Sequence, residues 1–145
     1  MRKTGFTLLE ILLVMTLISI LLVILIRLIN PYQQVGDINN AQRRADVLSI
    51  YTAVNQYRDA NSGNLPTGIT DELKSICKPG CSVSSDKIDI SEAIETYIAF
   101  GNIPIDPQQS ENSDVTGYTI YVTSQGRVVV SATLAQNGDI INTLE

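Results

Sequence analysis

Glu10 is an ionisable residue at the start of a long apolar segment, and it is the first candidate for a functional role in this sequence. It directly precedes an apolar run, Ile11 to Ile26, that contains no charged residue. An ionisable side chain at membrane depth costs a few kcal/mol and therefore needs a partner. Cleavage between Gly5 and Phe6 would create an α-ammonium group, and the Glu10 carboxylate of a neighbouring copy could pair with it in a low-dielectric setting. We therefore predict processing at Gly5 and Phe6, and an assembly contact at Glu10.

Most other chemistry is excluded by composition. The chain has no histidine, which removes imidazole general bases, Ser-His-Asp triads and His-containing zinc sites. A formal net charge of −5, from 10 Lys+Arg against 15 Asp+Glu, leaves no basic field to attract nucleic acid. No nucleotide-binding motif is present. We expect no enzymatic activity and no direct nucleic-acid binding.

The chain has two cysteines, Cys77 and Cys81. Pro79 and Gly80 between them favour a tight turn that could bring the two Cα atoms within reach of a disulfide. Two thiols without histidine are poor zinc ligands, and a thioredoxin-type pair would have two intervening residues instead of three. We predict a small disulfide loop, which suits a domain delivered outside the cytoplasm.

The N-terminal segment must position Glu10. From Phe6 to Arg27, a helix rising about 1.5 Å per residue would be roughly 31 Å long, close to the thickness of a bilayer core. Arg2 and Lys3 precede it, so the positive-inside rule keeps the N-terminus in the cytoplasm and sends the rest across. A secretory signal peptide or simple anchor is the alternative. However, no small-residue cleavage site follows the apolar run, and neither alternative explains Glu10.

A second helical pattern runs from Asp37 to about Ala60 and has two apolar faces. One face would pack on the protein's own sheet and the other on neighbouring helices in an assembly. The alternative is a helix enclosed within its own domain. Polar residues, including Arg43 and Asp46, are expected on the flanks between the faces. The first face comprises Ile38, Ala41, Ala45 and Leu48, and the second comprises Val47, Ile50, Val54 and Tyr57.

The remaining sequence predicts a small head. A loop follows Ser62, and residues 71–76 are expected to form a turn of helix. Asp89 to Glu92 resembles a capping box that opens a short helix ending by Gly101. The β-branched stretches 118–122 and 127–134 predict a hairpin, with a short last strand at 140–141. The predicted fold class is α+β, with a long N-terminal helix, apolar then amphipathic, packed on a small antiparallel sheet.

The stretch from Arg2 to Glu10, RKTGFTLLE, followed by an apolar helix, resembles the class III signal of type IV pilins and type II secretion pseudopilins. The resemblance implies that prepilin peptidase cuts after Gly5, that Phe6 becomes N-methylated and that Glu10 guides docking into a helical homopolymer. It also implies a membrane platform protein and an assembly ATPase as partners, and membrane lipid before assembly. Members often have a proline near the position of Arg27. Here Pro31 follows four residues later, so local helix melting on assembly is expected to shift toward Asn30-Pro31 and Gly36, or to be absent.

This resemblance implies four segments: a leader at 1–5, a transmembrane and assembly half-helix at 6–29, a second half-helix at 30–62, and a head at 63–145. Residues 104–107 and the closing hairpin also resemble the C-terminal half of major pseudopilins, more weakly. Some members bind calcium near this region. Asp106, Glu111 and Asp114 are therefore weak candidates here, while a solvated acidic loop is the alternative. No cofactor is predicted.

The predicted function is a structural subunit of a type IV pilus-like filament that serves adhesion, motility or DNA uptake. It would be a single-pass precursor in the inner membrane and then part of an extracellular filament. A type II secretion pseudopilin, in a short periplasmic pseudopilus, is the first alternative. A membrane-anchored extracytoplasmic binding module is the second, and it predicts an uncleaved N-terminus.

Overall fold

The computed structural model describes residues 5–28 and 30–144, and it divides into two compact units, Met1–Val35 and Gly36–Glu145. Each unit is described by itself. The predicted leader residues 1–4, with Arg2 and Lys3, lie outside the described residues, as does Ile29 at the predicted end of the first half-helix.

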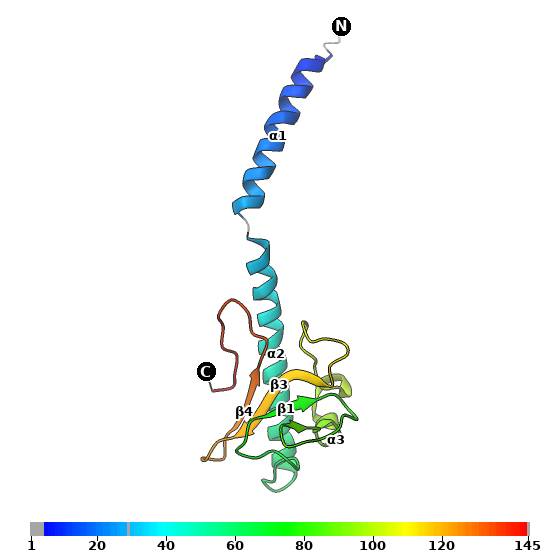
Figure 1. Cartoon of the computed structure of the whole chain (residues 1–145), viewed down its shortest axis with the longest axis vertical. Coiled ribbons are helices and arrows are strands. Elements are labelled where there is room, and N and C mark those ends of the chain that lie inside the picture. Colours follow the sequence, from blue (N-terminus) through cyan, green and yellow to red (C-terminus); the bar gives the residue numbers. More distant parts are fainter. Residues whose placement is uncertain (1–4, 29, 145) are drawn as a thin grey trace. The chain divides into compact units, whose positions relative to one another are not determined.

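The first unit contains helix α1, Leu8–Leu28 (Figure 1). Thr7 precedes it, and the Thr7 hydroxyl oxygen accepts the Glu10 backbone N–H at 3.2 Å. A side-chain oxygen in this position satisfies one of the free N–H groups of a helix start. The hydroxyls of Thr16 and Ser19 donate to carbonyls one turn back, Leu13 O and Met15 O, at 2.8 Å. These polar side chains are thus compatible with an apolar environment.

Helix α2 extends over Pro31–Ala60, and its part from Gly36 on belongs to the second unit. Proline suits the first turn of a helix, where its missing N–H is not needed. At the other end Ser62 and Gly63 have positive φ angles of 57° and 90°, and the Gly63 N–H donates to Arg58 O at 2.8 Å. Such a left-handed ending closes the last turn of a helix. Gly36, an expected site of melting, lies inside α2 and is buried.

Burial confirms that one of the two predicted faces of α2 packs within the domain, while the packing of the other face on neighbouring helices stays a prediction. Val47, Ile50 and Val54 are buried, whereas Ile38, Ala41, Ala45 and Leu48 are exposed. The expectation that Arg43 and Asp46 lie on polar flanks is wrong, because both are buried.

A four-stranded sheet forms the centre of the second unit, in the order β2-β1-β3-β4. Strands β3 (Val115–Val122) and β4 (Val128–Ala132) form the predicted hairpin. β1 (Lys74–Cys77) is antiparallel to β3, but β2 (Lys87–Ile88) is parallel to β1. The α+β class is confirmed, while the purely antiparallel sheet is corrected to a mixed one.

Two local predictions need correction. The expected helical turn at 71–76 is wrong, because Lys74 and Ser75 pair with Ile120 and Thr119 of β3, and this tertiary pairing outweighs local propensity. The expected last strand at 140–141 is reduced to one isolated bridge, between Asn142 and Ser131 of β4. The predicted helix after Asp89 is present as α3, Ser91–Ile94, followed by two 3₁₀ turns.

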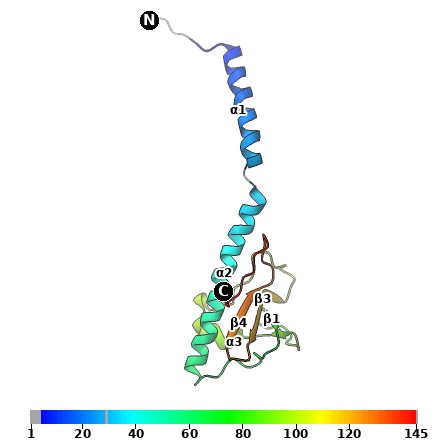
Figure 2. The same ribbon diagram turned by 90° about the vertical axis from the view of Figure 1, so that its left-hand side faces the viewer.

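The core lies between α2 and the sheet. From Gly36 on, α2 runs alongside the sheet, and the turns around α3 lie beside it (Figures 1 and 2). One continuous cluster joins side chains of α2, β1, β3, β4 and the α3 region. Its members include Val47, Ile50, Val54, Ile76, Ile94, Tyr118, Ile120 and Val130.

Candidate functional site

The predicted processing site, Gly5 and Phe6, directly precedes the capped start of α1. Both residues are exposed and non-helical, and 79% of Phe6 is accessible. Glu10 lies in the first turn of α1 and is exposed. None of the ion pairs among residues 5–28 and 30–144 includes Glu10. The carboxylate is therefore free to meet a cation from outside this part of the chain.

Helix α1 presents its apolar side chains on every side. None of its 21 residues is buried, and leucines around it, such as Leu12 and Leu21, are more than half exposed. Its mean hydropathy reaches 3.0 over an 18-residue window, so Leu8–Leu28 is long and apolar enough to cross a membrane. A helix that is hydrophobic all round requires an apolar environment. This unit is thus built for lipid or for contact with other helices.

The predicted disulfide is confirmed: Cys77 and Cys81 are bonded, with their Cα atoms 6.1 Å apart. Cys77 ends β1 and is fully buried. The Gly80 N–H in the loop donates to Asp89 Oδ2 at 3.0 Å, and Asp89 Oδ1 accepts the Ser91 N–H. Burial raises the pKa of Asp89, but the hydrogen bonds from the Ser91 hydroxyl and from the Ser91 and Gly80 N–H groups outweigh it and hold the pKa below its usual value. Asp89 therefore ties the disulfide loop to the start of α3.

The sequence prediction missed a buried ion pair between α2 and the 104–107 segment. Arg43 Nε and Nη2 donate to Asp106 Oδ2 and Oδ1 at 2.6 and 2.9 Å, and neither side chain is exposed. The pKa of Arg43 is raised by the Asp106 hydrogen bond. The remaining guanidinium N–H groups bond Asn40 and Gln108, each at 2.9 Å. Full hydrogen bonding is what a buried charge pair requires.

A second buried contact lies one turn further along α2. The Tyr118 hydroxyl of β3 donates to Asp46 Oδ2 at 2.6 Å, and Gln42 donates to Asp46 Oδ1 at 2.8 Å. Burial, and then the bond to Asp46, raise the pKa of Tyr118. Spacing could have revealed that Arg43 is buried, although not which residue it contacts. Arg43 lies four residues before Val47, so it continues the stripe of Val47, Ile50 and Val54 that faces the core.

Two of the three weak calcium candidates, Asp106 and Asp114, are paired with cations of the chain through their carboxylates, and Glu111 contacts a third cation only through its backbone carbonyl. Asp106 bonds Arg43, whereas Asp114 accepts Lys87 Nζ at 2.9 Å. The backbone carbonyl of Glu111 accepts Lys78 Nζ at 3.2 Å. Within the part of the chain that the structure describes, no three Asp, Glu or Cys side chains are placed to hold a metal together.

Comparison with known families identifies the N-terminal signal. Residues 1–26 match the family model described as the prokaryotic N-terminal methylation motif. The chain therefore carries the class III signal of type IV pilins and pseudopilins, as the resemblance of residues 2–10 predicted. The motif implies processing by prepilin peptidase and assembly into a filament. No curated protein and no solved structure matches the chain.

Proposed function

We propose that this protein is a structural subunit that polymerises through its N-terminal helix into a type IV pilus-like filament. Prepilin peptidase would cut between Gly5 and Phe6, and Phe6 would then be N-methylated. The observation that carries the proposal is the methylation motif at residues 1–26, joined to a helix, Leu8–Leu28, whose apolar surface is exposed throughout.

Assembly would pair Glu10 with the new α-ammonium of Phe6 in a neighbouring copy. Both charges are costly at membrane depth when alone, and pairing them removes much of that cost. Glu10 supports this role because it is exposed in the first turn of α1, directly after the capped start. Before assembly, lipid would cover α1. A platform protein and an assembly ATPase would supply the energy, because the chain contains no nucleotide-binding motif.

The exposed face of α2 would continue the contact between copies. Ile38 and Leu48 are 69% and 60% accessible, although the opposite face of the same helix is packed against the sheet. Large apolar side chains along one stripe are a common mark of a protein–protein contact. The head itself would act as a scaffold without catalytic activity, and it would be displayed outside the cell.

The intact mass of the chain purified from its native membrane or filament fraction tests this proposal, with N-terminal fragments to locate the change. We expect loss of residues 1–5, one added methyl group on Phe6, and two fewer hydrogens for Cys77 and Cys81. A full-length mass in functional material would contradict processing. It would leave Glu10 without its partner and favour a membrane-anchored binding module.

A type II secretion pseudopilin is the second candidate, because the methylation motif is the signal of pilins and pseudopilins alike. Both candidates share processing, methylation and helical assembly, so the mass measurement supports them equally. Electron microscopy of the producing cells separates them. Long surface filaments that incorporate this chain would support the pilus, whereas material confined to the envelope would support the short periplasmic form.

A further inference from the structure

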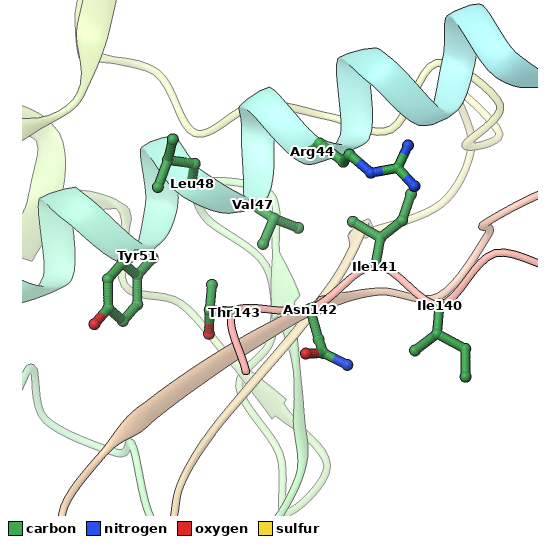
Figure 3. A pocket seen from close by; sticks show the side chains of 8 residues that line it. All are labelled: Arg44, Val47, Leu48, Tyr51, Ile140, Ile141, Asn142 and Thr143. Carbon is green, nitrogen blue, oxygen red and sulfur yellow. The ribbon is translucent and has the colours of Figure 1, made fainter. Parts of the chain in front are cut away.

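A groove of about 280 Å³ runs between α2 and the C-terminal segment of the second unit. Figure 3 shows Val47 and Ile141 facing one another between the helix and the segment. Leu48 lies on the helix side and is 60% exposed. For comparison, a cavity of about 150 Å³ lined by aliphatic and aromatic side chains can hold benzene. The groove can thus accept an aliphatic side chain. Its lining comprises Arg44, Val47, Leu48, Tyr51, Ile140, Ile141, Asn142 and Thr143.

The groove lies at the β4 end of the sheet. Residues 141–143 run beside β4: the Ala132 N–H donates to Ile141 O at 3.0 Å, and the Thr143 N–H donates to Val130 O at 3.1 Å. Arg44, at the groove, keeps 56% of its side chain exposed although it bonds Asp139 at 2.9 Å. The groove therefore combines an apolar floor with a half-exposed arginine whose carboxylate partner, Asp139, is itself at the surface.

The opposite, β2 end of the sheet carries an exposed stretch at residues 82–86 that contains the turn directly before β2 and is called here the turn at residues 82–86. All five of its residues are exposed, and Val83 is 63% accessible. Asp86 belongs to this turn and accepts the Ser84 hydroxyl at 2.6 Å. That hydrogen bond holds the pKa of Asp86 below its usual value, so the carboxylate is ionised near neutral pH. The turn thus carries an exposed aliphatic side chain, Val83, and an exposed carboxylate, Asp86.

Two complementary features at opposite edges of one sheet could form a head-to-tail contact between copies. Such a contact does not close on itself when repeated, and it generates an open helical polymer if the rotation does not complete a ring. The methylation motif independently implies that copies of this chain assemble. These observations favour a second copy as the occupant of the groove.

We propose that the turn at residues 82–86 of one copy docks into this groove of the next copy. Val83 packs over Val47 and Leu48, and Asp86 pairs with Arg44. This inference rests on the proposed function, because it requires that the chain polymerises. It adds a specific contact between the globular domains of neighbouring copies to the contact between N-terminal helices.

Site-directed cross-linking of the full chain tests the contact. Copies with Leu48→Cys and copies with Val83→Cys are produced together, and the assembled fraction is treated with a short bismaleimide. We expect a cross-linked dimer that requires both substitutions. Leu73→Cys in place of Val83→Cys is the matched control, because Leu73 is equally exposed, at 61%, but lies outside the turn. The dimer should be lost with this control.

The outcomes separate the two proposals. Cross-linking of Leu48→Cys with Val83→Cys, and not with Leu73→Cys, supports the groove contact. The groove contact is wrong if assembled material forms normally but no cross-linked dimer appears. It is also wrong if Leu73→Cys gives as much cross-linked dimer as Val83→Cys. In both cases the proposal that the chain polymerises stands. If the unsubstituted chain is processed but never assembles, both proposals are wrong.

Charge reversal provides a second measurement. Asp86→Lys should reduce the assembled fraction, and adding Arg44→Glu should restore part of it. An unchanged fraction in Asp86→Lys would contradict the charge pairing.

Discussion

The two helices of this protein differ in whether the chain buries their side chains. No residue of α1 is buried, whereas α2 buries eight. The buried side of α2 finds its partners on the sheet of the same chain, through Val47, Ile50 and Val54. No residue of α1 finds such a partner within the described chain, so an apolar environment such as lipid or other helices would have to cover it. The head therefore buries its core within one chain, whereas the N-terminal helix leaves its apolar side chains exposed.

Charged residues follow the same division. Glu10 of α1 has no ion-pair partner among residues 5–28 and 30–144. Arg43 of α2 is fully enclosed and bonds Asp106, Asn40 and Gln108. A charge that is satisfied within the chain stabilises the chain, whereas an exposed and unpaired one is available for contacts between chains. A charged residue thus serves stability in one helix and, in our proposal, assembly in the other.

The largest effect is expected from removing the enclosed charge of α2. Arg43→Ala leaves Asp106 buried without its partner, and breaking a buried ion pair costs about 3–5 kcal/mol. Urea unfolding of the full chain in detergent micelles, followed by tyrosine fluorescence, measures this loss. Arg44→Ala is the matched control, since it removes the neighbouring arginine from an exposed pair that contributes about 0–1 kcal/mol. Equal losses in the two variants would show that the buried pair is not a major source of stability.

A second, smaller difference is expected between apolar side chains of the two helices. Ile50→Ala creates a cavity in the core and should lower the free energy of unfolding of the head by about 2–5 kcal/mol. Leu17→Ala in α1 removes a side chain that is 53% exposed, so the head should change by no more than about 0.5 kcal/mol. The same urea titration in micelles measures both. A comparable loss in Leu17→Ala would mean that α1 contributes to the stability of the head.

The features that could be predicted from the sequence are those that depend on residues close together in the chain. The motif around Glu10 and the presence of an apolar N-terminal helix depend on composition and on residues close together in the chain, so both could be predicted. The disulfide between Cys77 and Cys81 is equally local, because Pro79 and Gly80 favour the turn. The buried and exposed faces of α2 followed from helical periodicity.

Long-range pairing could not be predicted in the same way. Arg43 and Asp106 are 63 residues apart, and no local pattern links them. Strand β1 was mistaken for a helical turn because its four residues become a strand by pairing with β3. β2 consists of two residues whose parallel pairing with β1 depends on the fold around it. For Arg43 the signal was nevertheless present, since a charge on a buried stripe requires a partner.

The smallest expected effect concerns an exposed pair of the head, Lys87 and Asp114. The hydrogen bond from Lys87 holds the pKa of Asp114 below its usual value, and the same bond raises the pKa of Lys87. The lowered pKa of Asp114 means that its contribution to stability is complete above about pH 4 and is lost as the pH falls through the folded-state value. The raised pKa of Lys87 means that its contribution is complete below about pH 10 and is lost at higher pH.

Lys87→Met should therefore make the head less sensitive to acid. The difference in free energy of unfolding between pH 7 and pH 3 should shrink, because Asp114 then titrates nearer its usual value in the folded state. Lys74→Met is the control: Lys74 donates to the Gly68 carbonyl, which does not titrate, so the pH difference should be retained. Urea titrations at the two pH values measure both variants. If Lys74→Met reduces the difference as much as Lys87→Met, the acid sensitivity reflects general positive charge and not this pair. If neither variant reduces the pH difference in the free energy of unfolding, the acid sensitivity comes from other carboxylates of the head. Asp86 and Asp89 are then the next to test, because hydrogen bonds also lower their pKa values.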